Sequence, residues 1–222
     1  MISRIAVLAS GAGSNLQAIL QYLAALRPAD AGIVSLVASD KRQAGALEIG
    51  ARAGIPAVTI ADPDDGRSIL ALLADHEIGL VALAGYLKRV PDAVTRRYRG
   101  HIVNVHPALL PAFGGPGMYG KRVHQAVLGA GVRVTGVTVH FVDEAYDHGP
   151  IIAQWPVPVL AGDTPSVLAA RVLRAEHRLY PCAVAAVASG RISLDAAGTV
   201  GGETATPVAS PVFRLQTEES EL

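Results

Sequence analysis

The sequence predicts an α/β fold: a mostly parallel central sheet with helices on both faces and an antiparallel addition in the C-terminal part. Two observations support this prediction. Through the first half of the chain, short apolar runs rich in β-branched residues alternate with helical patterns, as expected for parallel strands buried on both faces. After residue 106 this alternation gives way to a Pro- and Gly-rich segment and two longer apolar runs.

The first half contains five predicted strands and four predicted helices. The strands are the short apolar runs, at Arg4–Leu8, Ile33–Ala38, Ala57–Ile60, Leu80–Ala84 and Ile102–His106. The helical patterns lie between them, at Asn15–Ala25, Ala44–Ala53, Ser68–Asp75 and Pro91–Tyr98. Pro91 suits the first position of a helix, where its missing N–H costs nothing.

The second half begins with a loop and a predicted hairpin. Pro107–Lys121 holds three Pro and four Gly in fifteen residues, which predicts an irregular loop. A short helix is predicted over Val123–Leu128. Val134–Val142 and Ile151–Val159 are predicted strands joined by a turn, and their addition makes the sheet mixed.

The C-terminal part begins with a long helical pattern over Pro165–Ser189. Pro181 lies inside it and is expected to kink or interrupt the helix near Leu179–Tyr180. From Thr199 the chain is rich in Gly, Thr, Pro and Ser and ends in an acidic stretch. We therefore expect one domain over residues 1–198 and a mobile tail over residues 199–222.

Composition excludes several classes of protein. The 222 residues carry 19 Lys plus Arg and 19 Asp plus Glu, and this balance argues against a large nucleic-acid footprint or a polybasic membrane surface. With 50% hydrophobic and 17% charged residues, the chain as a whole is not disordered. No targeting or membrane-spanning segment is visible, and the single cysteine, Cys182, suits a reducing cytoplasm.

A glycine-rich loop, residues 10–15, follows the first strand and opens the first helix. Gly11 and Gly13 allow a close backbone approach, and the helix N-terminus presents free N–H groups, which favours a monophosphate site. Leu16 occupies the third glycine position of the dinucleotide fingerprint, so that fingerprint is absent and Asp40 is not interpreted as its ribose-binding acid. The alternative is a tight turn capped by Ser14.

Asn104 and His106 end the fifth predicted strand, and alternation places them on one face. Ligands of open α/β sheets bind at the carboxyl ends of strands. An amide donor beside an imidazole is suited to stabilising an oxyanion and moving a proton. The alternative is an Asn that caps the next loop and a His bonded to backbone.

Thr138, His140 and Asp147 form the last candidate group. The first two share one face of the sixth predicted strand, and Asp147 follows in the turn. A carboxylate near an imidazole favours the imidazolium form, but Asp147 also suits an ordinary turn, and spacing alone does not bring it to His106. The seven histidines show no His-x-x-x-His spacing, so no metal site is predicted; His140 and His148 with Asp147 would be ligands only by chance of folding.

Together these residues resemble the folate-dependent formyltransferase family, and most closely the members that act on glycinamide ribonucleotide. The resemblance runs from about residue 4 to residue 194. The matching segments are Leu8–Ile19, Ala84–Lys88, Asn104–Pro111, Gly136–Ile152 and Ala175–Pro181.

The resemblance implies a Rossmann-like formyltransferase fold and a specific reaction. A formyl group passes from 10-formyltetrahydrofolate to the primary amine of glycinamide ribonucleotide, giving formylglycinamide ribonucleotide and tetrahydrofolate in de novo purine (IMP) biosynthesis. The folate is a cosubstrate, and no tightly bound cofactor, metal, nucleic acid or membrane is expected. A monomer or a homodimer is expected.

The resemblance also implies roles for individual residues. Asn104, His106 and Asp147 match the catalytic trio. The substrate-binding residues, for the ribonucleotide phosphate and the glycinamide, are Gly13, Ser14, Asn15 and Glu176. The folate-binding residues are Arg67, Leu87, Lys88, Arg89, Val90, Asn104 and Val142.

One segment departs from the family pattern, and other functions remain open. The loop over residues 112–124 is longer and richer in glycine than expected. Methionyl-tRNA formyltransferase would need an added domain and a basic surface, formyltetrahydrofolate hydrolase an extra N-terminal domain, and sugar-amine formyltransferases as a rule lack the glycine loop seen here. Outside the family, the alternatives are a nicotinamide oxidoreductase and a non-catalytic nucleotide-binding module.

Overall fold

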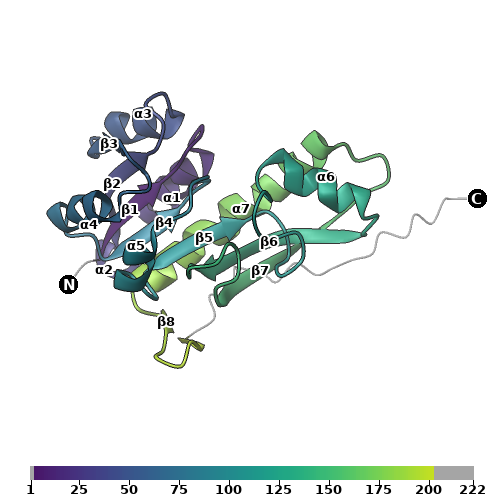
Figure 1. Cartoon of the computed structure of the whole chain (residues 1–222). Helices are drawn as coiled ribbons and strands as arrows, with labels where there is room; N and C mark the ends of the chain where they lie inside the picture. The colour runs from purple at the N-terminus through teal and green to yellow at the C-terminus, as the bar shows by residue number, and fades with distance from the viewer. Residues whose placement is uncertain (1–2, 203–222) are drawn as a thin grey trace, which may run out of the picture.

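A seven-stranded mixed sheet forms the centre of the protein (Figure 1), in a computed structural model that describes residues 3–202. Its strand order is β3-β2-β1-β4-β5-β6-β7. The first five strands are parallel, and β6 and β7 are antiparallel additions, which confirms the predicted mixed sheet. The bounds are β1 Arg4–Leu8, β2 Ile33–Ser39, β3 Ala57–Thr59, β4 Leu80–Leu83, β5 Ile102–His106, β6 Val134–Phe141 and β7 Ile151–Pro158.

Helices cover both faces of the sheet because its central strands are apolar on both sides. In β1, Ile5 and Val7 belong to a core cluster with α1 and α7, whereas Ala6 and Leu8 belong to a second cluster with α4 and α5. The helices are α1 Ser14–Ala24, α2 Pro28–Ala31, α3 Gly45–Arg52, α4 Gly66–Asp75, α5 Asp92–Arg97, α6 Lys121–Gly129 and α7 Pro165–Ala188. The short α2 was not predicted.

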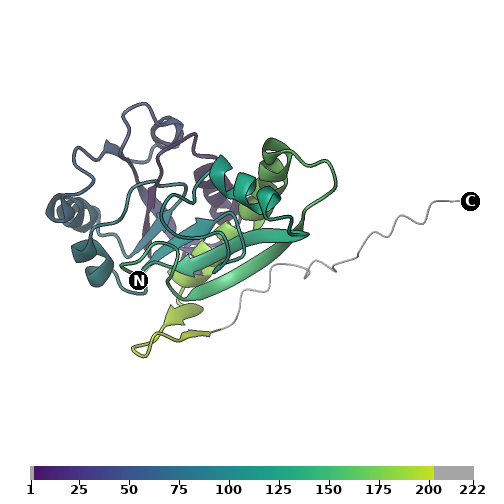
Figure 2. The ribbon, with the colours of Figure 1, turned by 45° about the vertical axis from the view of Figure 1, so that its right-hand side comes forward.

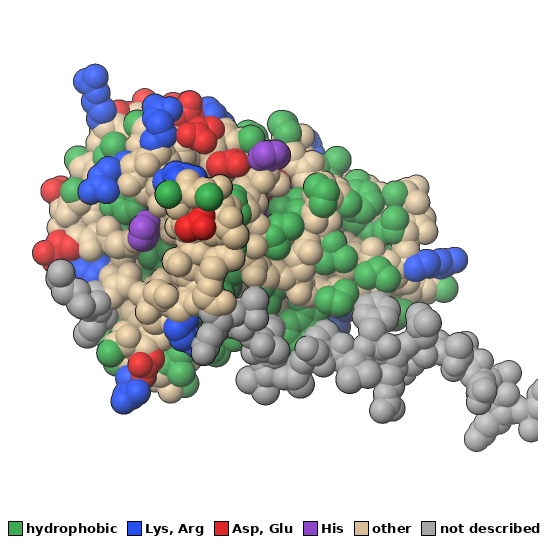
Figure 3. Space-filling view, turned by 90° about the horizontal axis from the view of Figure 1, so that it is seen from below, with side chains coloured by type: hydrophobic (Ala, Val, Ile, Leu, Met, Phe, Trp, Pro, Cys, Tyr) green, Lys and Arg blue, Asp and Glu red, His purple; other side chains and the backbone are tan. Residues whose placement is uncertain are grey.

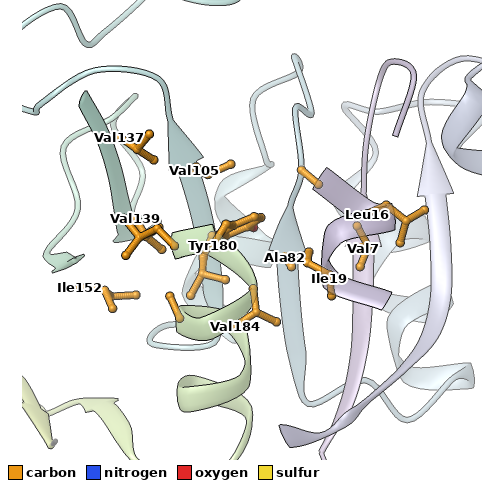
Figure 4. Close-up of a cluster of buried hydrophobic side chains, with 14 of the residues drawn as sticks. Val7, Leu16, Ile19, Ala82, Val105, Val137, Val139, Ile152, Tyr180 and Val184 are labelled. Atoms are coloured by element: carbon orange, nitrogen blue, oxygen red, sulfur yellow. The ribbon is translucent and has the colours of Figure 1, made fainter. Parts of the chain in front are cut away.

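The first cluster joins the two halves of the sheet. Leu16 and Ile19 of α1 pack beside Val7, and Tyr180 and Val184 of α7 pack beside β5 and β6 (Figure 4). The β6–β7 hairpin lies along α7 (Figure 2). Helix α7 thereby brings residues from the end of the chain to strands from both halves.

Helix α7 runs without interruption through Pro181, so the predicted break near Leu179–Tyr180 is wrong. Proline removes one N–H from the helix ladder, which is a local cost. Tyr180 is fully buried, and its hydroxyl oxygen lies 2.9 Å from the Leu83 carbonyl and 3.1 Å from the Val103 carbonyl. This packing against β4 and β5 holds the helix continuous despite the proline.

A small hairpin follows α7. Strands β8 Ile192–Leu194 and β9 Val200–Gly202 pair antiparallel. The prediction of a tail from Thr199 is therefore wrong for the residues of β9, whereas residues 203–222 lie outside the described part. Within residues 3–202, the longest helices are too short or too polar to cross a membrane.

Candidate active site at the carboxyl ends of β4 and β5

A cavity of about 730 Å³ opens beyond the carboxyl ends of β4 and β5. This is the edge at which open α/β sheets bind ligands, because the loops that follow parallel strands diverge there. Fifteen polar or charged residues line the cavity, namely Asn15, Tyr86, Lys88, Arg89, Asn104, His106, Tyr119, Lys121, His124, His140, Asp143, Glu144, Tyr146, Asp147 and Glu176. The predicted catalytic trio thus shares one cavity.

Two histidines from neighbouring strands lie beside Asn104. His140 is 2% exposed, and its Nδ1 lies 2.7 Å from the Phe141 carbonyl, so Nδ1 carries a proton and donates it. Its Nε2 lies 3.1 Å from Nδ2 of Asn104 and therefore accepts from that amide. Burial, the largest effect, lowers the pKa of His140, in agreement with a neutral ring. His140 thus fixes which way the Asn104 amide points.

His106 is placed between two acceptors. Its Nε2 lies 2.8 Å from the Phe113 carbonyl, and its Nδ1 lies 3.5 Å from Oδ2 of Asp147. The ring is 3% exposed. Because a carbonyl and a carboxylate both accept hydrogen bonds, this environment suits a ring protonated on both nitrogens.

Asp147 supplies the negative charge that faces both rings. Its Oδ2 accepts the Gly115 N–H at 2.9 Å, and its Oδ1 lies 3.8 Å from Nε2 of His140. Burial alone would raise the pKa of Asp147, but the hydrogen bond and charge of His106, with the Gly115 N–H, lower it overall. Asp147 is therefore a carboxylate at neutral pH.

The loop after β5 holds Asp147 in place. Asp147 has a φ of +54°, and a Cβ added to Gly114 would lie 3.1 Å from Cβ of Asp147 and 2.5 Å from Cδ2 of Leu110. A larger residue at position 114 would therefore require both Leu110 and Asp147 to shift. Thr138 accepts from the Leu110 N–H and donates to the Ala108 carbonyl, so it anchors this loop rather than facing the cavity.

Asn15 and Glu176 meet at the wall formed by α1 and α7. The Asn15 amide donates to Oε2 of Glu176 at 2.7 Å, although the two residues are 161 positions apart. Burial, the largest effect, raises the pKa of Glu176, against the opposing effects of Asn15 and His106. Oδ1 of Asn15 is buried and has no hydrogen-bond partner among the described residues. This unpaired acceptor belongs to a side chain that lines the cavity.

The remaining predicted substrate-binding residues lie next to this wall. Gly13 is the N-cap of α1 with a φ of +83°, and a Cβ there would lie 2.8 Å from Cα of Ala46. Ser14 is the first residue of α1 and does not cap it through its side chain, contrary to the simple-turn alternative. Neither residue is among those that line the cavity.

The predicted folate-binding residues divide into two groups. The segment from Leu87 to Val90, together with Asn104 and Val142, lines the cavity. Arg67 does not: it lies in the first turn of α4, where its N–H bonds to Asp65. The structure therefore does not bring Arg67 to the other predicted site residues.

Sequence reasoning missed the full environment of the trio. It placed His140 on the correct face but assigned it no role, and it left out His124, which lines the cavity while 4% exposed. The alternation along the strand could have indicated that His140 faces Asn104. No local signal in the sequence indicated that His124 lines the cavity. Within residues 3–202, His, Cys, Asp and Glu form no group of three suited to a metal ion.

The fold and this site define a class of enzyme suited to acyl transfer. A buried amide donor and an imidazole beside a carboxylate can stabilise an oxyanion and move protons. Residues 3–184 match the model of the family described as "Formyl transferase". The chain belongs to this formyl transferase family.

Individual relatives agree with this assignment. The chain is 42% identical over 210 residues to a phosphoribosylglycinamide formyltransferase of Mycobacterium tuberculosis, covering 92% of this chain and 91% of the relative. It is 43% identical to the chloroplastic phosphoribosylglycinamide formyltransferase of Vigna unguiculata, covering 85% of this chain. The chain spans 62% of that plant relative and 66% of its Arabidopsis thaliana counterpart.

A solved structure is similar in fold as well. The phosphoribosylglycinamide formyltransferase of Anaplasma phagocytophilum superposes with a TM-score of 0.81 at 37% sequence identity. The match covers 90% of this chain and 93% of the other.

Proposed function

We propose that this protein transfers the formyl group of 10-formyltetrahydrofolate to the primary amine of glycinamide ribonucleotide, in de novo purine biosynthesis. The observation that carries the proposal is the arrangement of Asn104, His106 and Asp147 around one cavity. The activity named for the M. tuberculosis relative, which the chain matches almost end to end, supports the choice of acceptor.

The chemistry requires a nucleophilic attack and two proton movements. The acceptor nitrogen bonds to the formyl carbon, and the carbonyl oxygen becomes an oxyanion. The bond from that carbon to N10 of the folate then breaks. The amine loses a proton and N10 gains one, so the products are the formamide and tetrahydrofolate.

The trio has a group for each need. The Asn104 amide is oriented by His140, and the His106 ring is suited to a positive charge; both are donors for the developing oxyanion. Asp147 is ionised, faces His106 and can accept a proton from the attacking amine, directly or through water, and pass the same proton to N10 as the bond from the carbon to N10 breaks. The site is buried, which strengthens each of these interactions.

The two ends of the cavity suit the two substrates. Asn15 and Glu176, near the N-terminus of α1, suit the phosphate and glycinamide parts of the acceptor, because helix N-terminal N–H groups attract anions. The Leu87–Val90 segment and Val142 present apolar and basic side chains that suit a folate. We propose the folate as a consumed cosubstrate, and Gly13 and Ser14 as further phosphate contacts. Arg67 is left out of the proposed site.

The proposed partners are small molecules. On the face seen in Figure 3, Lys and Arg side chains lie among Asp and Glu rather than in one basic patch, which speaks against nucleic acid there. We propose a cytoplasmic location, because the lone Cys182 suits a reducing compartment. A monomer or a homodimer fits the proposal equally.

The test is a two-substrate assay. Purified protein is mixed with 10-formyltetrahydrofolate and glycinamide ribonucleotide, and release of tetrahydrofolate is followed by absorbance. Release that depends on the ribonucleotide supports the proposal. Release of tetrahydrofolate without any acceptor would indicate a hydrolase. No release in the mixture that contains both substrates would refute formyl transfer to this acceptor.

A further inference from the structure

His124 is a buried titratable side chain that the proposed chemistry leaves without a role. It lies in the first turns of α6 and is 4% exposed, yet it lines the catalytic cavity. Its Nδ1 is buried and has no hydrogen-bond partner among the described residues. Buried polar atoms are nearly always paired, so an unpaired nitrogen on a side chain that lines a ligand cavity points to a partner supplied by a ligand.

The position of α6 indicates which substrate would supply that partner. Helix α6 packs against α7, whose residues Leu173 and Glu176 line the same cavity. Glu176 is hydrogen-bonded to Asn15 at the N-terminus of α1, on the wall proposed for the acceptor. The segments proposed for the folate, 87–90 and 142, come from other elements.

The charge state of His124 indicates the chemistry of the partner. Burial, and then the nearby charge of His106, lower the pKa of His124. A neutral imidazole offers one N–H donor and one nitrogen acceptor. It therefore complements a neutral group such as a hydroxyl or an amide better than a phosphate.

We propose that His124 hydrogen-bonds a neutral polar group of the acceptor, a ribose hydroxyl or the glycinamide amide, and so sets the affinity for the acceptor. This inference rests on the proposed function, because it takes glycinamide ribonucleotide as the acceptor. His124 is a specificity-determining residue in this account and takes no part in bond making. A residue needed only for packing would be served better by an apolar side chain at this site.

The test compares His124→Leu and His124→Gln with Gln125→Leu, an exposed position on the same helix. Calorimetry measures binding of glycinamide ribonucleotide, and steady-state kinetics measure both KM values. His124→Leu should weaken acceptor binding and raise the acceptor KM about tenfold, with the folate KM and kcat within about threefold of the parent. His124→Gln should restore part of the loss, and Gln125→Leu should change neither value.

Two results would overturn this inference. One is unchanged acceptor binding in a folded His124→Leu protein. The other is an equal loss for both substrates together with a lower melting temperature, which would indicate a structural role only. If His124→Leu does not fold, the acceptor Kd of His124→Gln is the deciding measurement. Binding of both substrates as tight as in the parent, together with a lowered stability, would then overturn the inference. Binding of the acceptor without any formyl transfer would instead count against the proposed reaction alone.

Discussion

Replacement of Asp147 by Asn should slow formyl transfer by about 10²–10⁴-fold. The change removes one charge but keeps the shape, and the Asn amide oxygen can still accept the Gly115 N–H. In the parent protein Oδ2 lies 3.5 Å from Nδ1 of His106, and the Asp147 side chain is 10% exposed. The perturbation therefore acts on one buried charge pair rather than on the fold of the loop.

The size of the effect follows from that distance. Opposite unit charges 3.5 Å apart attract by about 5 kcal/mol at an effective dielectric constant of about 20. Each factor of ten in rate corresponds to about 1.4 kcal/mol. Complete loss of this attraction in the transition state would therefore slow the reaction by at most between about 10³- and 10⁴-fold. Loss of a general base costs about 10²–10⁴, so the two approaches agree.

The assay is steady-state kinetics with both substrates varied, together with calorimetric binding of each substrate. The expected loss lies in kcat, because the charge matters most in the transition state, and both Kd values should change less than about fivefold. Asp75→Asn is the control, since this exposed carboxylate lies in α4 and is not among the residues that line the cavity; its kcat should stay close to that of the parent. A kcat of Asp147→Asn within about threefold of the parent would refute the reasoning.

Three further predictions follow from single contacts. Gly114→Ala should lower kcat about 10²-fold, because the added Cβ displaces Asp147, while circular dichroism should show that the protein is still folded. A turnover like that of the parent would be inconsistent with this packing. Asn15→Leu should raise the acceptor Kd at least about tenfold and leave folate binding nearly unchanged by calorimetry, and equal losses would contradict the assignment. Burial lowers the pKa of the His177 side chain from 6.5. Above about pH 6.5 this side chain is neutral in both the folded and the unfolded chain. As the pH falls below that value, the unfolded chain binds a proton more readily, so the folded protein loses stability. In urea unfolding, His177→Gln should therefore lose less stability than the parent between about pH 7.5 and 5.5, and identical losses would argue against a lowered pKa of His177.

The architecture was predictable because hydrophobic patterning decides it. A run such as Leu80–Ala84 is apolar on both faces, and only a strand inside a covered sheet buries both. The break at Pro181 was wrongly predicted because a local rule does not account for the packing of Tyr180 between α7 and two strands. The β8–β9 hairpin was missed because its three-residue strands carry too little pattern.

The site was predictable where its residues lie on regular strands. Alternation correctly placed Asn104 and His106 on one face, and His140 on the facing strand. The approach of Asp147 depends on a left-handed turn and on Gly114, and sequence spacing contains neither piece of information. Motif resemblance, rather than spacing, therefore led to Asp147. The same resemblance also led to Arg67, which does not line the cavity.

The most direct test of the account is transfer of an isotopic label. The protein is supplied with 10-formyltetrahydrofolate labelled with carbon-13 in the formyl group and with unlabelled glycinamide ribonucleotide, and carbon-13 NMR follows the label. The account predicts that the formyl signal moves to the formamide of the ribonucleotide with the parent protein. With His106→Ala the transfer should be at least about 10²-fold slower. Label that appears as free formate, or that stays on the folate with parent protein, would contradict the central claim.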